Sequence, residues 1–375
     1  MKIVIAPDSF KESLTALEVA TAIERGFKQV FPNAHYLKVP VADGGEGTVR
    51  SLVDATQGSM VELRVAGPAG ENVDAFFGIL GDGKTAVIEM AAASGLHLVP
   101  SEMRNPMTAC SRGTGELILA ALDEGVNKII LGLGGSATND GGVGMMKALG
   151  VVFRGKSGSV IESGGQGLGK IADIDLAQLD SRLPRVQFEV ACDVDNPLCG
   201  EKGASAIFAA QKGATPEMIM RLDNNLSHYA GQLKKQLGKD VAQLAGGMGA
   251  SVLAFFAATL RPGVDIVTEM VGLAKKVVDA DLVITGEGRI DSQSIHGKAP
   301  IGVARIAQAA GCPVIGLAGS LSSDCDVVFD HGLDAVFAIV PRCMNVSDAL
   351  AAGAENLTVT CRNLAAVIAM KTALK

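Results

Sequence analysis

The first 60 residues alternate β-rich runs with helical patterns, and this alternation restricts the fold more than any other feature of the chain. A β-rich run at residues 2–6 precedes a segment at 15–31 in which apolar residues recur every three or four positions. A second run at 36–41 leads into another helical pattern. Strands that alternate with helices predict a parallel sheet with right-handed crossovers.

The same alternation returns towards the other end of the chain. Helical patterns at 249–260 and 264–278 precede it. Strand-like runs then occur at 282–285, 313–318 and 335–340, with helical patterns at 302–310 and at 347–372. Both ends of the chain therefore favour one parallel sheet.

The middle of the chain has a different pattern of predicted strands and helices. Runs at 60–66 and 73–80 read as paired strands around the turn-forming Gly67-Pro68-Ala69-Gly70, and helices are expected at 114–122 and 216–237. We therefore predict an α/β protein of two domains. Residues 1–60 and 241–375 form a discontinuous Rossmann-like parallel-sheet domain, and residues 61–240 form an inserted mixed α/β domain. Such an insertion places the active site in the interdomain cleft.

Composition excludes several classes of partner. The 375 residues have a formal net charge of -7, no Trp and two Tyr, which argues against nucleic-acid binding. No segment approaches the length of an apolar membrane span, so no membrane partner is expected. The apolar run at residues 2–6 is too short for a signal peptide, so we expect a cytoplasmic protein.

A glycine-rich stretch at residues 132–144 (GLGGSATNDGGVG) follows the apolar run at 128–131 and precedes a helical pattern. This order predicts strand, loop and helix. Glycines let backbone N–H groups approach a ligand, and a helix N-terminus favours negative charge, so the loop suits a phosphorylated ligand. The alternative is a capped βα turn with no ligand.

Five further polar stretches contain glycine or a possible helix cap. With the glycine-rich loop they supply carboxylates, cations and hydroxyls, the mixture that phosphoryl transfer uses. Each also has a purely structural explanation, such as a helix cap or an Arg–carboxylate pair in a loop. One shared site accounts for six such stretches more economically than six unrelated turns do. The other five lie at 8–13, 43–48, 111–116, 193–200 and 286–298.

Common catalytic signatures are absent. The chain has no Gly-x-x-x-x-Gly-Lys-Ser/Thr, which argues against a P-loop fold. The glycine pairs at 132–134 and 247–249 lack the third glycine of a dinucleotide fingerprint. A serine-hydrolase elbow and a His-Glu-x-x-His helix are missing too.

Several strings spread along the chain occur together in one known family. They are APDSFKES at 6–13, VADGGEGT at 41–48, SRGTGEL at 111–117, GGSATNDGG at 134–142, CDVDNPL at 192–198 and TGEGRID at 285–291. In this order the sequence resembles the bacterial type I glycerate kinases, most closely those that make 2-phosphoglycerate, over essentially its whole length. One departure is a shorter stretch, 241–245, before the glycines at 246–249.

The resemblance implies a two-domain α/β fold, ATP as donor, Mg²⁺ as the required ion and D-glycerate as acceptor, with the loops facing one interdomain cleft. We expect Asp193 to be the general base or a metal ligand, and Asp291 and Glu287 to bind the metal. Lys11 and Arg289 would act in catalysis by neutralising charge on the phosphates and the substrate carboxylate. The predicted binding residues are Asp8, Ser9, Asp43, Glu46, Ser111, Arg112, Gly134, Gly135, Ser136, Thr138, Asn139 and Lys298.

Alternatives remain open at this point. A nicotinamide-dependent oxidoreductase acting on a small acid is one rival, although the fingerprint is missing. A sensor that keeps the cleft without catalysis is another. The residues themselves do not distinguish 2-phosphoglycerate from 3-phosphoglycerate as product. They also leave open which loop binds ATP and which binds glycerate, and whether the protein forms a homodimer.

Overall fold

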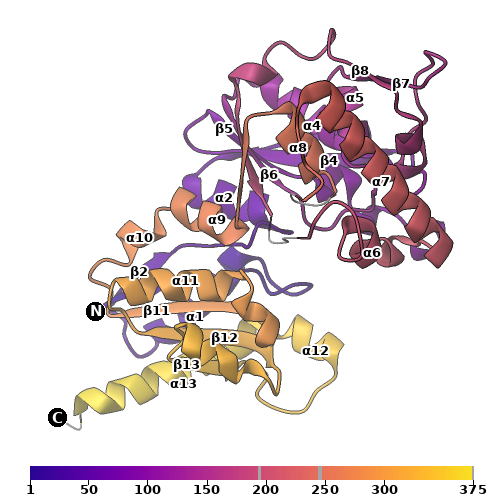
Figure 1. Cartoon of the computed structure of the whole chain (residues 1–375). Coiled ribbons are helices and arrows are strands. Elements are labelled where there is room, and N and C mark those ends of the chain that lie inside the picture. The colour runs from indigo at the N-terminus through magenta and orange to yellow at the C-terminus, as the bar shows by residue number, and fades with distance from the viewer. Residues whose placement is uncertain (193–195, 244–246, 374–375) are drawn as a thin grey trace. The chain divides into compact units, whose positions relative to one another are not determined.

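The computed structural model describes residues 1–192, 196–243 and 247–373 (Figure 1). Contacts between Cα atoms divide the chain into two compact units. Unit 1 comprises Met1–Asp43, Arg50–Gln57 and Pro262–Lys375, and unit 2 comprises Gly44–Val49 and Gly58–Arg261. The predicted domain ranges, 1–60 with 241–375 and 61–240, stay a prediction.

Unit 1 is built on a five-stranded sheet in the order β13-β12-β11-β1-β2, in which every pair of neighbouring strands is parallel. Its strands are β1 (Lys2–Ile5), β2 (His35–Lys38), β11 (Leu282–Ile290), β12 (Val314–Leu321) and β13 (Ala335–Ala338). The central strand β11 starts at residue 282, and its neighbour β1 comes from the start of the chain. The predicted α/β fold, with one parallel sheet drawn from both chain ends, is confirmed.

Helices cover both faces of this sheet. The helices of unit 1 are α1 (Ala16–Lys28), most of α2 (Thr48–Thr56), α9 (Gly263–Met270), α10 (Leu273–Lys276), α11 (Ala299–Ala309), α12 (Val346–Ala351) and α13 (Gly353–Ala373). On one face, Ile3 and Ile5 of β1 pack in a core with α1 and α13. Because side chains alternate along a strand, Val4 faces the other side, where α11 lies against β11 and β12.

Helix α1 illustrates how the local sequence sets these elements. Thr15 caps its N-terminus in a capping box with Glu18, whose carboxylate accepts the Thr15 backbone N–H at 2.9 Å. Val19, Ile23 and Phe27 then recur at helical spacing and are fully buried. Each such side chain stabilises the fold by roughly 1.5–3 kcal/mol relative to an exposed one.

Unit 2 contains a six-stranded mixed sheet in the order β10-β9-β6-β5-β4-β3. Strands β5, β6, β9 and β10 are parallel to one another. Strands β3 and β4 form an antiparallel hairpin, and β4 pairs antiparallel with β5. The strands of this sheet are β3 (Ser59–Ala66), β4 (Asn72–Ile79), β5 (Thr85–Glu89), β6 (Lys128–Gly132), β9 (Gln187–Ala191) and β10 (Ala258–Arg261). A separate pair joins β7 (Val152–Arg154) to β8 (Asp173–Asp175).

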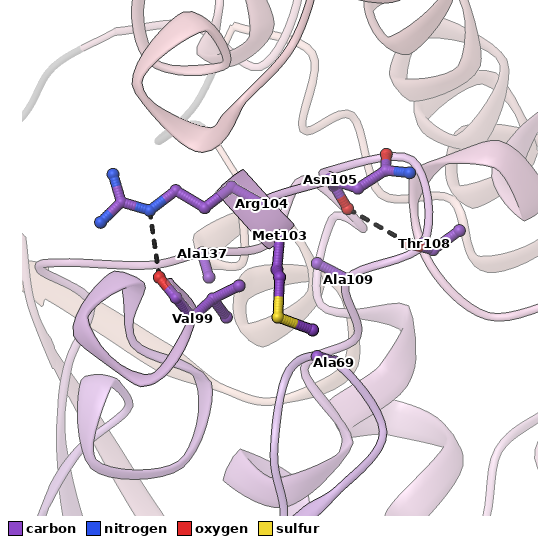
Figure 2. A pocket seen from close by; sticks show the side chains of 8 residues that line it. All are labelled: Ala69, Val99, Met103, Arg104, Asn105, Thr108, Ala109 and Ala137. Carbon is purple, nitrogen blue, oxygen red and sulfur yellow. Dashed lines mark hydrogen bonds between the residues drawn. The ribbon is translucent and has the colours of Figure 1, made fainter. Parts of the chain in front are cut away.

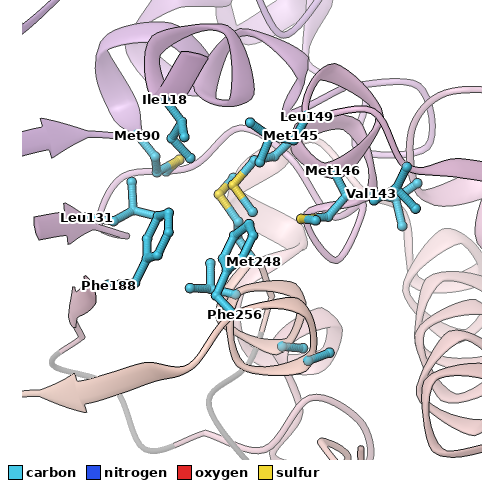
Figure 3. Close-up of a cluster of buried hydrophobic side chains, with 14 of the residues drawn as sticks. Met90, Ile118, Leu131, Val143, Met145, Met146, Leu149, Phe188, Met248 and Phe256 are labelled. Atoms are coloured by element: carbon cyan, nitrogen blue, oxygen red, sulfur yellow. The ribbon is translucent and has the colours of Figure 1, made fainter. Parts of the chain in front are cut away.

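The core of unit 2 lies between this sheet and its helices, and Figure 3 shows part of it. The helices are α3 (Ala91–Ser94), α4 (Arg112–Asp123), α5 (Val143–Ala148), α6 (Ala204–Phe208), α7 (Pro216–Leu237) and α8 (Gly249–Phe255). Phe188 of β9 stacks on Phe256, just after α8, with ring centroids 4.4 Å apart. None of the helices among the described residues is long and apolar enough to cross a bilayer.

Three of the predicted helices need correction. The helix predicted at 249–260 ends at Phe255, and Ala258–Arg261 instead forms β10, because this segment pairs with β9. The helix predicted at 264–278 is interrupted at Gly272, which adopts a left-handed conformation with φ 64°. The helix predicted at 347–372 is two helices, with the break at Ala352.

Strand β9 is absent from the sequence prediction, although it lies between β6 and β10 in the sheet. It carries Glu189, an unusual residue for a buried strand. The structure explains this residue, because Glu189 forms ion pairs with Lys128 Nζ at 2.9 Å and with Arg261 Nη1 at 3.5 Å. Charges supplied by the two neighbouring strands therefore make the buried carboxylate tolerable.

Candidate active site

In the sheet of unit 1, the direction in which successive strands are added reverses between β1 and β11. Strand β1 connects through α1 to β2 on one side, and β11 connects through α11 to β12 on the other. Ligands of open parallel sheets bind at such a point, beyond the carboxyl ends of the strands. Asp8 follows β1 at this point, and its backbone N–H donates to the Gly286 carbonyl in β11 at 2.8 Å.

Acidic side chains gather at this edge. The pKa of Asp8 is raised well above its ordinary value, first by loss of contact with water and then by the charge of Asp43, with a smaller effect from Glu287. Burial also raises the pKa of Glu287, and Asp43 adds to that rise. The mutual influence of Asp8, Asp43 and Glu287 places these three predicted residues in one electrostatic neighbourhood.

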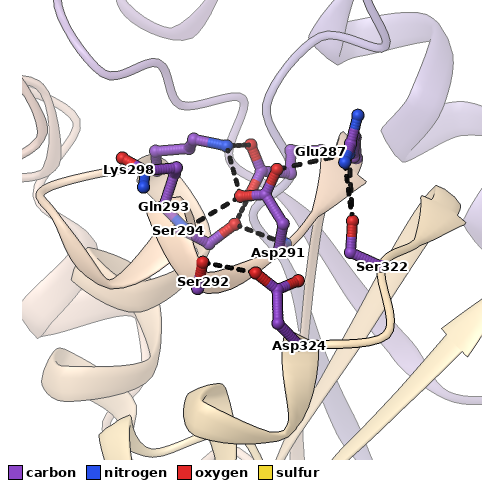
Figure 4. A network of polar contacts seen from close by, with 9 residues as sticks. Glu287, Asp291, Ser292, Gln293, Ser294, Lys298, Ser322 and Asp324 are labelled. Atoms are coloured by element: carbon purple, nitrogen blue, oxygen red, sulfur yellow. Dashed lines mark hydrogen bonds and ion pairs between the residues drawn. The ribbon is translucent and has the colours of Figure 1, made fainter.

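Cations and carboxylates alternate on the outer part of β11 and after it (Figure 4). Lys298 Nζ lies 3.2 Å from Glu287 Oε2 and 3.5 Å from Asp291 Oδ1. The second oxygen of Asp291 lies 3.2 Å from Arg289 Nε. Ser294 Oγ donates to the other oxygen of Glu287 at 2.6 Å. The structure thus brings four predicted residues, Glu287, Arg289, Asp291 and Lys298, into one network.

This network depends on β11 being longer than predicted. We expected the strand to end at residue 285, but it runs to Ile290 because Arg289 and Ile290 pair with Ser320 and Leu321 of β12. Asp291 then caps the short 3-10 helix η6 (Ser292–Ile295) by accepting the Gln293 N–H at 3.0 Å. The polar groups are therefore held by a strand and a capped turn.

The other predicted residues of unit 1 lie close by. The Ser9 backbone N–H donates to its neighbour Asp8 at 2.6 Å. Lys11 is exposed, and its backbone nitrogen lies 3.4 Å from where a Cβ on Gly288 would be. The segment carrying Ser9 and Lys11 therefore passes over the outer part of β11.

In unit 2 the glycine-rich loop follows β6 at the carboxyl edge of the parallel strands. The segment Gly44–Val49 packs against it: a Cβ on Gly132 would lie 2.6 Å from the Gly44 carbonyl oxygen. Glu89, at the end of β5, accepts the Val49 N–H at 2.8 Å. Burial raises the pKa of Glu89 to about 7, and the exposed Glu46 contributes to this.

The outer side of the glycine-rich loop presents hydrogen-bond donors. Among the described residues, the backbone N–H groups of Gly134, Gly135 and Ser136 have no acceptor. Gly134 and Gly135 are exposed, and Gly135 has φ 77°. Successive N–H groups around a left-handed residue form a concave anion-binding arrangement. The loop can therefore bind a phosphate group through its backbone.

The inner side of the same loop is buried. Asn139 exchanges hydrogen bonds with Ser205, and the Thr138 side chain is buried as well. Asp140 accepts the backbone N–H and the hydroxyl of Ser111, at 2.9 and 2.8 Å, and two further amides of the loop. Ser111, Thr138 and Asn139 thus point into unit 2, where their side chains stabilise the loop.

Arg112 lies at the start of α4 and is exposed. Its Nε forms an ion pair with Glu116 one turn later, at 2.8 Å. Glu116 also accepts the Ala66 backbone N–H at 2.8 Å. Arg112 is therefore oriented by a neighbour that is itself attached to the end of β3.

A pocket lies beside Ala137 of the loop (Figure 2). Arg104 lies on its rim, with Nε donating to the Val99 carbonyl at 3.2 Å. Five of the eight lining residues are apolar, and Arg104, Asn105 and Thr108 supply the polar groups. The lining residues are Ala69, Val99, Met103, Arg104, Asn105, Thr108, Ala109 and Ala137.

Comparison with known proteins identifies the family. The model of the glycerate kinase family matches residues 3–369, nearly the whole chain. This chain belongs to the glycerate kinase family. Family membership makes the protein an enzyme of the kinase class and disfavours the oxidoreductase and sensor alternatives.

Individual relatives agree with this assignment. A Bacillus subtilis glycerate kinase is 60% identical over 98% of both chains. A protein of Escherichia coli K12 named glycerate 2-kinase is 56% identical over 99% of this chain and 98% of its own length. A crystal structure assigned as glycerate kinase 2 from Salmonella typhimurium LT2 superposes with a TM-score of 0.91 at 56% identity, covering 100% of this chain and 99% of that one.

Some residues of this glycerate kinase family member were predicted but lie outside the described structure, and others were not predicted. Asp193, the predicted base, lies outside the described residues, as do residues 244–246 within the shortened glycine stretch. Sequence reasoning also missed Glu89 and Lys212, which hold the loops of unit 2. The sequence offered no signal for them, since each is a common residue type whose partners are distant in sequence.

Proposed function

We propose that this protein is an ATP-dependent kinase that transfers the γ-phosphoryl group to the 2-hydroxyl of D-glycerate, giving 2-phosphoglycerate and ADP. The observation that carries the proposal is the run of backbone N–H groups at Gly134–Ser136, which have no acceptor among the described residues and suit the phosphate of a nucleotide. The relative named glycerate 2-kinase, at 56% identity, supports the choice of acceptor and of its 2-hydroxyl.

The transfer balances as a single displacement. The 2-hydroxyl oxygen forms a bond to the γ-phosphorus while the bond from that phosphorus to the β,γ-bridging oxygen breaks. The electron pair leaves with ADP, and the hydroxyl proton passes to a carboxylate base. We assign this base to Asp193 because of the family resemblance. A loose transition state requires mainly alignment and charge stabilisation, so a carboxylate of ordinary strength suffices.

Cations of unit 1 supply the charge stabilisation in this proposal. Lys298 and Arg289 are already oriented by Glu287 and Asp291, at 3.2 Å in each pair. Lys11 extends from the segment that passes over β11. Fixed cations at the edge of a sheet neutralise a carboxylate or a phosphate without reorganising during the reaction.

The predicted Mg²⁺ would neutralise part of the negative charge of the phosphates. Within the described residues no cluster of three His, Cys, Asp or Glu side chains could hold a metal by itself. Magnesium that arrives with a nucleotide needs only one or two carboxylates. Asp8 and Asp43 fit this need, because their mutual repulsion raises the pKa of Asp8. Glu287 and Asp291 already share Lys298, so the metal role predicted for them requires that ammonium to move.

The direct test is an assay of the purified protein with ATP, Mg²⁺ and D-glycerate. We expect ADP release that requires all three, and phosphorus NMR should show 2-phosphoglycerate. Absence of turnover with D-glycerate and with other small hydroxy acids would refute the kinase proposal, and 3-phosphoglycerate as product would refute the assigned position. Asp193→Asn should lower kcat by orders of magnitude with an unchanged circular dichroism spectrum.

A further inference from the structure

Lys212 is a buried cation behind the glycine-rich loop. It ends the 3-10 helix η5 (Ala210–Lys212), and its side chain is 7% exposed. Its Nζ donates to Ser136 Oγ at 2.6 Å and to the Thr138 carbonyl at 2.7 Å. The contact joins the loop to a segment more than 70 residues later in the chain.

This ammonium has no carboxylate within ion-pair distance among the described residues, and its two hydrogen bonds go to a hydroxyl and a carbonyl. A buried cation without an ion pair costs free energy, and burial accordingly lowers the pKa of Lys212 to about 8. The negative charge of Asp140 in the loop opposes this lowering of the pKa. Arg104 is attached to the residue before Lys212, since its Nη1 donates to the Gln211 carbonyl at 3.4 Å. An anion bound nearby would compensate the charge.

In the hydrogen bond between Lys212 and Ser136, the donor and the acceptor are fixed by chemistry. An ammonium only donates, so Ser136 Oγ is the acceptor and its own proton must point elsewhere. Ser136 is half-buried, with its hydroxyl at the boundary between Lys212 and the outside of the loop. Together with the N–H groups of Gly134, Gly135 and Ser136, the hydroxyl therefore makes the outer side of the loop a surface of donors.

We propose that Lys212 is the positioning residue of this loop: it holds residues 136–138 so that these donors converge on one phosphate group of the nucleotide, and its charge strengthens their attraction. The inference rests on the proposed function for the identity of the anion. It names a residue, and a reason for its burial, that the family resemblance did not supply. Lys212 acts through Ser136 and the loop backbone, not by contact with the reacting atoms.

Kinetic constants test the proposal. Lys212→Met keeps the length of the side chain and removes its charge, whereas Lys212→Arg keeps the charge. We expect Lys212→Met to raise the KM for ATP about tenfold or more, since a charge-assisted hydrogen bond is lost, and to change the KM for D-glycerate less than about twofold. Lys212→Arg should recover part of the loss. The matched control is Lys235→Met, an exposed lysine of α7, with wild-type constants.

A binding measurement that needs no turnover gives the second readout. Calorimetric affinity for ADP should fall in the wild type between pH 7 and pH 9, as Lys212 loses its proton near a pKa of about 8. Lys212→Met should bind weakly across this range without that fall, and Lys212→Arg should show no fall because its guanidinium stays charged.

The outcomes separate this inference from the proposed function. Wild-type protein that binds ADP with the expected pH dependence but does not phosphorylate D-glycerate would refute the function and leave the role of Lys212 intact. Active wild-type protein whose Lys212→Met variant has an unchanged KM for ATP and an unchanged ADP profile would overturn the inference. A rise confined to the KM for D-glycerate would also overturn it.

Discussion

The carboxylate of Glu89 accepts the backbone N–H of Val49 at 2.8 Å, across 40 residues of sequence. Val49 lies in the first turn of α2, where helix N–H groups lack intrahelical acceptors. The carboxylate at the end of β5 therefore caps a helix that starts in a distant part of the chain. Because burial raises the pKa of Glu89 to about 7, this cap is sensitive to pH near neutrality.

We predict that Glu89→Gln makes the stability of the protein less dependent on pH. The folded pKa of Glu89 is about 7, above the ordinary value of 4.5, so its stabilising contribution is complete below pH 4.5 and is lost as pH rises through 7. The loss is on the order of 3 kcal/mol. Denaturant unfolding at several pH values should show a smaller decline for Glu89→Gln than for wild type. The exposed Glu62→Gln serves as control, and equal declines for all three proteins would contradict the prediction.

Asp140 should be essential for stability rather than for the chemical step alone. Its two oxygens accept four hydrogen bonds, from the amide and hydroxyl of Ser111 and from the amides of Gly142 and Gly144. Asp140→Ala leaves these buried donors without an acceptor and should cost about 3–5 kcal/mol. Asp140→Asn keeps one acceptor oxygen and should cost less. Guanidinium unfolding of both variants checks this order, and equally small losses for the two variants would contradict it.

Position 142 requires glycine because of its backbone conformation and its close neighbours. It has φ 81°, and a Cβ there would lie 2.9 Å from Ser251 Cβ. Gly142→Ala should therefore cost about 2–4 kcal/mol, from the left-handed conformation and from overlap with Ser251. Gly158 has the same φ of 81° with nothing within 4 Å of its would-be Cβ, so Gly158→Ala isolates the conformational cost, roughly 1 kcal/mol. Equal melting temperatures for the two variants would contradict the role of Ser251.

Lys298 should be needed for activity more than for folding. It lies between Glu287 and Asp291, and its loss would raise the pKa of Glu287 further, because its charge now lowers that pKa. We expect Lys298→Met to lower kcat/KM at least about tenfold, with Lys298→Arg retaining part of the activity. Lys275→Met, an exposed lysine of α10, is the control. A Lys298→Met enzyme with wild-type kinetics would show that the cation only compensates its two neighbours.

The sequence predicted those parts of the fold that depend on local pattern. The β3–β4 hairpin follows from alternating apolar residues around Gly67 and Pro68, and the parallel sheet of unit 1 follows from its βα alternation. Strand β9 could not be predicted in this way, since Glu189 becomes acceptable only beside Lys128 and Arg261. Long-range ion pairs of this kind leave no mark on local periodicity.

The same distinction holds for the candidate site. Motifs identified which loops carry polar groups, and the structure gathers Glu287, Arg289, Asp291 and Lys298 as one network. A motif does not show which side of a loop faces the interior. Ser111 reads as a binding residue in the string SRGTGEL, yet its side chain is buried and satisfies Asp140. Lys212 reads as an ordinary surface lysine until its contact with Ser136 is seen.

The position of β1 between β2 and β11 limits the order in which the chain can fold as it is synthesised. One edge of β1 pairs with β2 within 40 residues, but the other edge has no partner until β11 is made, beyond residue 282. Every strand of unit 2 has left the ribosome by then. The apolar edge of β1 must meanwhile be protected from other chains, because unpaired strand edges promote aggregation. The last sheet pairing to become possible beside β1 is thus the one that brings Asp8 next to Glu287, so a nascent chain acquires its acidic centre only after every strand of unit 2 has been made.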